Sequence, residues 1–391
     1  MNTQRTSPLP RAIRARGTIV SIALACVGLC AVPALAGERL TRTPQGDVLV
    51  LEAPAGVQRK LSTAALAHPF ATDRQRAAAT PLPWPADRGP AKSGAKDALP
   101  PEQRLLPPSI AEGGAAPSFA EYLARQHFDK AWRNIDDQRR RGTAPGPQHG
   151  SDKDGTHQPW VRYPGNLDSA QWTAAPWNKI GKLYFTTPDG GSSYCTANVA
   201  GRGSMIVTAA HCVYTPGQGF HRDFVFVPAE RHGIAPYGRY GWQSAAVLDD
   251  WTRNGDRRWD VAVLRLANEA TSGLPVTDYV GWLGRSWDRG YAQPTHSHGY
   301  AANLSTQFTH ICEGQTWSSG WEGADVLVQG CDMTYGSSGG GWLIHFTPNS
   351  HAGNYVNGVV SGPHMGDFGN SYVGPRFSSA NIVPLCSVMG C

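Results

Sequence analysis

From about residue 177 to the carboxyl terminus, the sequence consists of short apolar runs separated by residues that favour turns. The runs are rich in Val, Ile and aromatic residues and are punctuated by Gly, Pro, Asp or Asn; examples are KIGKLYF, SMIVTAAHCV, FVFVPA, VAVLRLA, GWLIHF and NGVVSG. Runs of this composition and spacing favour strands that follow one another over strands that alternate with helices. The sequence therefore predicts an all-β domain, either a barrel or a sandwich.

Residues 37–165 have a different composition from this β-rich region. They contain PLPWPADRGPAKSGAKDALPPEQRLLPPS, in which the prolines disfavour helix and sheet alike. One helix is expected at SFAEYLARQHFDKAWRNIDDQRRR, residues 118–141, where Ser118 suits an N-cap with Glu121 three residues later. We therefore predict a largely irregular leader over 37–165, with that single helix, attached to a compact domain at 166–391.

Residues 1–36 have the pattern of a secretory signal peptide. A basic opening is followed by the apolar run TIVSIALACVGLCAVPALA, which ends in the small-x-small sequence Ala34-Leu35-Ala36. The run is interrupted by Pro33 and is short for a stable membrane span, so no lasting membrane anchor is expected after cleavage. We therefore predict a secreted protein, either extracellular or periplasmic.

The formal net charge of +5 belongs largely to this signal peptide. Without the four arginines that precede the first acidic residue, the charge is +1; they are Arg5, Arg11, Arg14 and Arg16. A nearly neutral chain has no electrostatic footprint for phosphate groups, so no nucleic-acid partner is expected. A monomer is the expected state.

Cysteines are confined to the signal peptide and the β-rich region. Of the eight, Cys26 and Cys30 lie in the predicted signal, which leaves six in the exported chain. An even number in an exported protein indicates disulfides, although sequence alone permits fifteen pairings of six cysteines. No CxxC pair or His-x-x-x-His spacing occurs among them, so neither a metal site nor a cofactor is predicted.

Three places in the β-rich region carry chemically useful side chains. His211 ends the buried-type run IVTAAHCV, Asp260 stands at the start of WDVAVLRL, and a serine loop runs from Gly336 to Gly341 as GSSGGG. Each has an ordinary explanation, since strand-end histidines are often structural, aspartates cap turns and Gly-Ser runs form loops. Their joint occurrence within one disulfide-bearing β domain indicates catalysis.

The three residue types complement one another chemically. A serine hydroxyl is a poor nucleophile until a base takes its proton, and an imidazole titrates near the right pH to do so. A buried carboxylate holds that imidazole in one tautomer and stabilises it when it becomes positive. The glycines around Ser338 let consecutive N–H groups point at one spot, where they would stabilise an oxyanion.

The segments TAAHC, DVAVL and GSSGG resemble the three signatures of the chymotrypsin–trypsin superfamily of serine peptidases, in its His, Asp, Ser order. The nearer likeness is to bacterial secreted trypsin-like and glutamyl endopeptidases, in which CDMT precedes the serine loop, and it covers about residues 177–380. The resemblance implies two six-stranded antiparallel β-barrels with the active site between them. It also implies a serine endopeptidase that acts on polypeptides through an acyl-enzyme intermediate.

The resemblance assigns a role to each residue of the site. His211 becomes the general base, Asp260 the residue that orients it, and Ser338 the nucleophile. The backbone N–H groups of Gly336 and Ser338 become the oxyanion hole. Ser338 is preferred to Ser337 because the family pattern places two glycines directly after the nucleophile. The resemblance further implies the disulfide that braces the histidine loop, with two others remaining: Cys195–Cys212, then Cys312–Cys331 and Cys386–Cys391.

Activation is expected to differ from that of the digestive members of the family. They carry an aspartate before the nucleophile that binds the new amino terminus, whereas this chain has Ser337 and no Ile-Val-Gly-Gly start. Removal of the leader by cleavage near Arg139–Arg141 is an alternative hypothesis. That triplet can equally be the basic end of a helix, where positive charge complements the helix dipole.

The resemblance also places two residues in the pocket that selects the substrate side chain. Asp332 lies six residues before Ser338, the position that selects basic side chains in trypsin, and Ser361 lies in the strand NGVVSGPHMG. A carboxylate at the base of a pocket would pair with arginine or lysine. Glutamyl endopeptidases can carry aspartate there too, so both preferences stay open.

Two other functions fit parts of the sequence. A non-catalytic homologue would keep the barrels as a binding module, although the complete triad argues against it. Residues 336–340 also satisfy Gly-x-Ser-x-Gly, the nucleophile elbow of α/β-hydrolases, which would make the protein an esterase. That fold needs a strand–turn–helix context and a later histidine and acid. His351 and His364 do follow, but Pro, Gly and Asn interrupt every potential helix there.

Overall fold

A computed structural model describes residues 37–54, 70, 72–85, 107–117, 148–151, 159–165, 174–319, 325–364 and 367–391. The predicted signal peptide, the predicted helix at 118–141 and the Arg139–Arg141 triplet lie outside the described residues. Of the helices in the described ranges, none combines the length and the apolar character that crossing a membrane requires.

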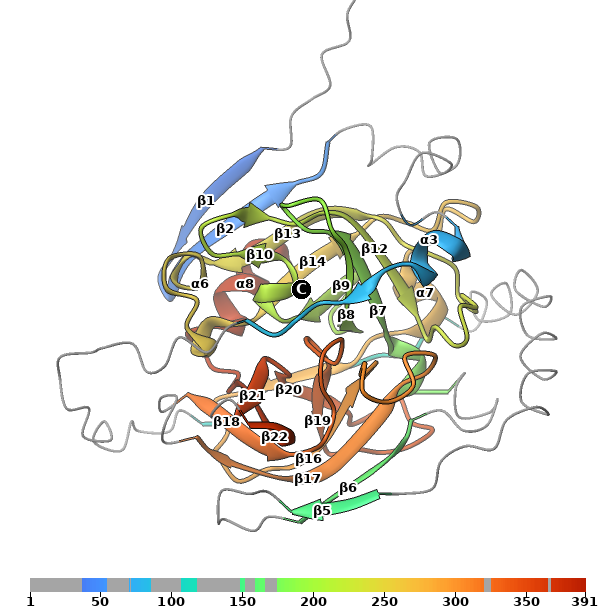
Figure 1. Cartoon of the computed structure of the whole chain (residues 1–391). Coiled ribbons are helices and arrows are strands. Elements are labelled where there is room, and N and C mark those ends of the chain that lie inside the picture. Colours follow the sequence, from blue (N-terminus) through green and yellow to red (C-terminus); the bar gives the residue numbers. More distant parts are fainter. Residues whose placement is uncertain are drawn as a thin grey trace, which may run out of the picture. The chain divides into compact units, whose positions relative to one another are not determined.

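The first β-barrel consists of six antiparallel strands, drawn in green and yellow in Figure 1. Around the barrel they follow the order β12–β7–β8–β9–β14–β13. Their bounds are β7 (Ile180–Thr186), β8 (Ser192–Val199), β9 (Met205–Thr208), β12 (Arg222–Pro228), β13 (Trp242–Leu248) and β14 (Ala262–Leu266). Phe226 on β12 and Tyr240, just before β13, exchange backbone hydrogen bonds of 2.8 and 2.9 Å, which closes the ring.

The second barrel also has six antiparallel strands, in the order β20–β19–β16–β17–β18–β22. They are β16 (Pro294–Gly299), β17 (His310–Ser318), β18 (Val326–Gly330), β19 (Gly341–Ile344), β20 (Tyr355–Val359) and β22 (Asp367–Pro375). β22 closes tightly against β20, because a Cβ on Gly374 would lie 2.0 Å from the carbonyl oxygen of Val359. The two closed barrels confirm the all-β fold class that the resemblance implied.

Shorter elements connect and cover the barrels. The helices are α3 (Asp73–Ala77), α6 (Asp249–Asn254), α7 (Val276–Val280) and α8 (Ile382–Met389), with 3-10 turns at Trp177–Lys179, Ala210–Cys212 and Arg257–Trp259. β10 (Tyr214–Thr215) pairs with β11 (Gly219–Phe220), and β21 (Gly362–His364) pairs with β22. The apolar face of α8, with helical spacing, enters the core of the first barrel through Ile382, Leu385 and Met389.

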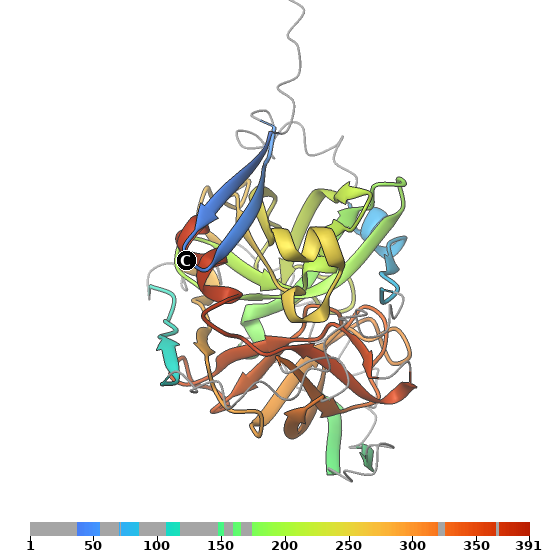
Figure 2. The same ribbon diagram turned by 90° about the vertical axis from the view of Figure 1, so that its left-hand side faces the viewer.

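The described parts of residues 37–165 form short strands that extend the two sheets, and the sequence pattern did not indicate these strands. The blue hairpin of β1 and β2 lies on β13 of the first barrel (Figure 2). β3 pairs with β8, β4 pairs with β15 beside β20, and β5 and β6 extend the second barrel from β17. The bounds are β1 (Glu38–Thr43), β2 (Gly46–Glu52), β3 (Thr80–Pro81), β4 (Ser109–Ala111), β5 (Gln148–Ser151), β6 (Pro159–Pro164) and β15 (Gly284–Trp287).

One contact between this region and the first barrel depends on a buried lysine. Lys179 is 1% exposed, and its ammonium group donates to the carbonyl oxygens of Trp282 at 3.0 Å and Gly114 at 3.3 Å. Burial lowers the pKa of Lys179 to about 7. An unfolded lysine keeps its proton up to a pKa of about 10.4, so between these values the unfolded state binds more protons. The destabilising effect of the buried charge is therefore complete below about pH 7 and fades as pH rises toward about 10.

We expect Lys179→Met to raise the free energy of unfolding by several kcal/mol at pH 6, and to raise it much less near pH 10. The two carbonyl oxygens keep a donor in the variant, because the N–H groups of Gly114 and Trp282 each bond the other's oxygen at 2.9 Å. Denaturant unfolding of both proteins across this pH range measures the difference. A gain of equal size at both pH values would contradict the assigned cause.

Candidate active site

His211 is held in the 3-10 turn Ala210–Cys212 that directly follows β9 of the first barrel. Cys212 forms a disulfide with Cys195 on β8, which ties this turn to the neighbouring part of the sheet. The His211 side chain is only 4% exposed. The histidine signature of the sequence is thus a rigid loop at the end of a buried strand.

A second histidine, His221, supports this loop and was not singled out in the sequence. Burial lowers the pKa of His221 to about 3, so its ring is neutral. Its Nδ1–H donates to the Cys212 carbonyl oxygen at 3.0 Å, and its Nε2 accepts from the Thr215 hydroxyl at 2.8 Å. The ring stacks on Phe185 with centroids 4.7 Å apart. The contact between His221 and Cys212 forms only in the folded chain, and no local sequence motif predicts it.

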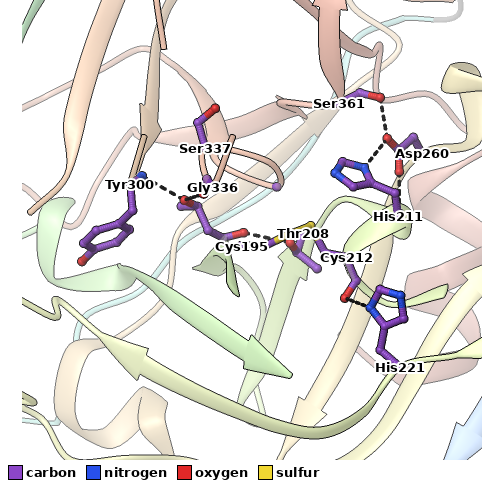
Figure 3. Close-up of a disulfide and its surroundings, with 12 residues drawn as sticks. Cys195, Thr208, His211, Cys212, His221, Asp260, Tyr300, Gly336, Ser337 and Ser361 are labelled. Carbon is purple, nitrogen blue, oxygen red and sulfur yellow. Dashed lines mark hydrogen bonds and ion pairs between the residues drawn. A yellow bond between two sulfur atoms is a disulfide. The ribbon is translucent and has the colours of Figure 1, made fainter. Parts of the chain in front are cut away.

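Asp260 holds His211 at two points and lies between His211 and Ser361 in Figure 3. Its Oδ1 accepts the backbone N–H of His211 and its Oδ2 accepts Nδ1–H, each at 2.8 Å, while the Ser361 hydroxyl also donates to Oδ2. Burial alone would raise the pKa of Asp260, but the charge of His211 and the hydrogen bonds from His211 and Ser361 lower it. The ionised carboxylate therefore keeps a proton on Nδ1 and leaves Nε2 as the basic nitrogen.

The serine loop joins β18 to β19 and is shaped by glycines that a larger residue cannot replace. Gly336 and Gly339 have positive φ angles of 82° and 77°. A Cβ on Gly339 would lie 1.9 Å from Oγ1 of Thr208, and one on Gly340 would lie 1.7 Å from the carbonyl oxygen of His298. The run of small residues is therefore a fixed loop pressed against both barrels.

One side of the serine loop is bound to the strand that carries the histidine-loop disulfide. The backbone N–H of Thr196 donates to the Ser338 carbonyl oxygen, and its hydroxyl donates to the Gly336 carbonyl oxygen, both at 2.8 Å. Thr196 directly follows Cys195, the disulfide partner of Cys212. The loop that contains the predicted nucleophile is thus fixed next to the loop that contains the predicted base.

The other side of the serine loop is bound to the segment that contacts Asp260. The N–H of Gly339 donates to the Val360 carbonyl oxygen at 2.8 Å, and the next residue, Ser361, bonds Asp260. The structure therefore gathers the three loops predicted from the sequence at the place where the two barrels meet.

One hydrogen bond of the predicted triad is not made. His211 Nε2 and Ser338 Oγ are both buried, and neither has a hydrogen-bond partner among the described residues. Buried polar atoms without partners are uncommon, because each loses its hydration without compensation. In sites of this type the nucleophile–base hydrogen bond often tightens only when substrate is present.

Ser337 is already engaged within its own loop. Its hydroxyl donates to the Thr334 carbonyl oxygen at 2.6 Å, and its backbone N–H donates to the same oxygen at 3.2 Å. That hydroxyl is a structural donor, whereas the hydroxyl of Ser338 has no competing partner in the described chain. Of these two hydroxyls, only that of Ser338 is free of a described hydrogen-bond partner, and the prediction that Ser338 is the nucleophile stays a prediction.

The predicted oxyanion hole consists of two backbone N–H groups, one on each side of Ser337 in the sequence. Within the described part of the chain, the N–H groups of Gly336 and Ser338 donate no hydrogen bond. Unpaired N–H groups on a loop held by glycines are what an oxyanion hole requires. Both residues predicted for that hole therefore have the donors available.

The two residues predicted for the specificity pocket are occupied by other contacts. Arg162, on β6, donates from Nε to Oδ1 of Asp332 at 2.6 Å. A substrate lysine or arginine would have to compete with this internal guanidinium group, which weakens the basic preference that Asp332 suggested. Ser361 is used to hold Asp260. Sequence reasoning missed Arg162 because it lies in the stretch assigned to the leader.

All three disulfides implied by the resemblance are present: Cys195–Cys212, Cys312–Cys331 and Cys386–Cys391. Disulfides of this number are typical of proteins in oxidising compartments.

In the described residues, two groups of side chains have a spacing suited to metal ions, and in both the cysteines are bonded to each other. Those cysteines offer no thiolate, and the expectation that the protein needs no metal stays a prediction.

Comparison with known proteins gives protease relatives of limited extent. No family model matches the chain. An extracellular metalloprotease of Bacillus subtilis (strain 168) is 27% identical over 112 residues, which are 29% of this chain and 34% of that protein. The chain therefore spans about a third of the length of this curated relative.

Solved structures with a similar fold are also proteases. Protease Anisep from Arthrobacter nicotinovorans is 27% identical, covers 55% of this chain and 97% of its own, and has a TM-score of 0.49. A thermostable serine protease AL20 from an extremophilic microorganism is 28% identical over 52% of this chain and 93% of its own, with a TM-score of 0.47. A Glu endopeptidase is 19% identical over 58% and 95%, with a TM-score of 0.46. The two barrels, with a histidine–aspartate pair on the first and a serine loop on the second, define a chymotrypsin-like architecture.

Proposed function

We propose that this chain is a secreted serine endopeptidase. The observation that carries the proposal is the pair of hydrogen bonds between His211 and the buried Asp260, beside a serine loop in which the Ser338 hydroxyl has no partner among the described residues. Because Nδ1 faces Asp260, Nε2 is the nitrogen that would act as the general base.

The reaction would begin with attack of Ser338 Oγ on the carbonyl carbon of a peptide bond, while His211 Nε2 takes the hydroxyl proton. The N–H groups of Gly336 and Ser338 would stabilise the negative charge that forms on the carbonyl oxygen. The protonated His211, stabilised by Asp260, would then give its proton to the leaving nitrogen, and an ester to Ser338 would remain. Attack by water in a second round of the same steps would release the acid and restore the serine.

One observation favours a second function, a non-catalytic binding module. The hydrogen bond between Ser338 and His211 is missing, and a protein that only binds peptides would not need it. The esterase alternative loses its structural basis, because the serine loop leads directly into β19, whereas a nucleophile elbow leads into a helix.

Covalent labelling of the secreted protein by a fluorophosphonate probe tests the proposal. We expect stoichiometric modification of Ser338, found by mass spectrometry of the modified peptide, and no labelling of a Ser338→Ala control. An unlabelled Ser338 in folded protein with intact disulfides would favour the binding module.

Amino-terminal sequencing of the same sample tests leader removal near Arg139–Arg141. A fully active enzyme that begins at Gly37 would rule that hypothesis out.

A further inference from the structure

A stretch of the amino-terminal region, residues 72–85, runs along the candidate active site. It comprises α3, β3 and the residues up to Pro85, and it is the blue segment that carries α3 in Figure 1. At the end of β3, the N–H of Leu82 donates to the Tyr194 carbonyl oxygen at 3.0 Å. Tyr194 precedes Cys195, which forms the histidine-loop disulfide. The segment thus follows the edge of the first barrel into the site.

Beyond β3, the segment forms one wall of a cavity at the catalytic histidine. The cavity has a volume of about 220 Å³, and its two sides include Leu82, Pro83 and Pro85 on one and His211, Tyr214 and Trp251 on the other. Largely apolar walls with a few polar side chains among them, here His211 and Tyr214, are typical of a substrate subsite. Here the chain's own amino-terminal segment lies against His211 at the position that a bound peptide would take.

Trp84 lies between these prolines and packs toward the serine loop. Its ring meets the ring of Tyr335 edge-on, with centroids 5.5 Å apart, and Tyr335 directly precedes the predicted oxyanion hole. Trp84 is buried and belongs to the same apolar cluster as Met333 and Val360. These two residues adjoin, in sequence, the two positions predicted for the substrate pocket. The indole ring therefore lies in the region where a substrate side chain is expected.

The other end of the segment is anchored by a buried charge. Arg76 on α3 is 3% exposed, and its Nε lies 3.7 Å from Oε2 of Glu230 on the first barrel. Glu230 also accepts from Lys182 at 3.3 Å and from the Tyr184 hydroxyl at 2.6 Å, and the Arg76 guanidinium donates to the Gly233 carbonyl oxygen at 3.4 Å. Removing one partner of a buried ion pair is costly, so this contact fixes α3 to the barrel.

We propose that residues 72–85 form an internal inhibitor that occupies the substrate groove, with Trp84 in the place of a substrate side chain. The inference rests on the proposed function, because it takes the groove beside His211 and the serine loop to be the substrate groove. An extended peptide that bonds a strand edge and fills a neighbouring pocket is a common mode of peptide recognition. The proline-rich stretch loses little conformational freedom when it is bound.

The prolines also protect this segment from cleavage at the active site that it covers. Pro83 follows Leu82 and Pro85 follows Trp84, so the nitrogen of each of these peptide bonds lies within a ring. That ring crowds the leaving nitrogen, to which His211 would have to deliver a proton. The segment can therefore stay in the groove without being cut, as an inhibitor must.

Initial rates of peptide hydrolysis by the chain with residues 37–165 intact test the proposal. Trp84→Ala and Arg76→Ala are expected to raise kcat/KM by at least about tenfold. A segment that covers the groove about nine-tenths of the time leaves about one-tenth of the protein open, and the apparent affinity for substrate is then about tenfold lower. The matched controls are Arg74→Ala, exposed on the same helix, and Leu40→Ala, exposed on β1; both should keep the parental rate. Parental rates in both test variants, with thermal unfolding unchanged, would overturn the proposal.

A measurement without turnover separates this inference from the proposed function. In a Ser338→Ala background, Trp84→Ala and Arg76→Ala are expected to speed hydrogen exchange of backbone amides at 211–215 and 333–338, whereas the two control substitutions are not. Faster exchange without hydrolysis in any Ser338-containing variant would reject the proposed function and keep the covered groove. Exchange equal to that of the controls would reject the inference at any level of activity. Arg76→Ala, which lies on α3 outside the second barrel, decides the matter if Trp84→Ala does not fold.

Discussion

Ser338→Ala is expected to lower kcat/KM for peptide hydrolysis by about 10⁴-fold or more, whereas Ser337→Ala should keep most of the activity. The first substitution removes a buried hydroxyl that, among the described residues, has no competing hydrogen-bond partner. The second removes the hydrogen bond from the Ser337 hydroxyl to the Thr334 carbonyl oxygen. That oxygen still accepts the backbone N–H of residue 337 at 3.2 Å. Steady-state kinetics on one peptide substrate, with purified and processed protein, measures both.

The pair of serine variants is its own matched control, because the two residues are adjacent and both are fully buried. Any general damage to the loop should appear in both variants, and circular dichroism and thermal unfolding detect it. If Ser337→Ala abolishes hydrolysis while Ser338→Ala retains it, Ser338 is not the nucleophile.

The barrels could be predicted from the sequence because their strands carry the signal locally. Runs such as VAVLRLA in β14 combine apolar residues with β-branched ones, and they are buried along almost their whole length. The strands within residues 37–165 have a weaker local pattern of apolar and β-branched residues. β2 does alternate, with Val48 and Val50 buried, but β3 and β4 are two and three residues long and form only because β8 and β15 are there to pair with. Tertiary pairing, which a local pattern does not contain, decides such elements.

The same distinction applies to the site. His211, Asp260 and Ser338 are each marked by the sequence around them, and the structure gathers their loops. Arg162 and Asp332 are 170 residues apart, and nothing near either residue indicates the other. The segment with Trp84 looked like an irregular linker because its prolines exclude regular structure. Prolines also suit a rigid extended peptide, and only its contacts distinguish these two roles.

Asp260→Asn is expected to lower kcat by roughly 10³- to 10⁴-fold, with the fold retained. In the native site all three surrounding groups donate to the carboxylate: the backbone N–H and Nδ1–H of His211, and the hydroxyl of Ser361. An asparagine replaces one acceptor oxygen with an NH₂ group. If that group faces Nδ1, the imidazole must move its proton to Nε2 and can no longer act as the base. If it faces the backbone N–H, two donors oppose each other in a buried site.

Ser361→Ala is the matched control for Asp260→Asn, because it removes one of the three donors and leaves the His211–Asp260 contacts intact. We expect a loss in kcat of at most about a hundredfold, since a hydrogen bond to a charged group contributes about 1.5–3 kcal/mol. Acid unfolding gives a second readout. The pKa of Asp260 is lowered in the folded state, so its ionised form stabilises the protein above the ordinary carboxyl pKa of about 3.9, and this contribution is lost as pH falls through the folded pKa. The asparagine variant should therefore show a weaker dependence of unfolding free energy on pH in the acid range. If Asp260→Asn keeps the parental kcat, the imidazole does not take its orientation from this carboxylate.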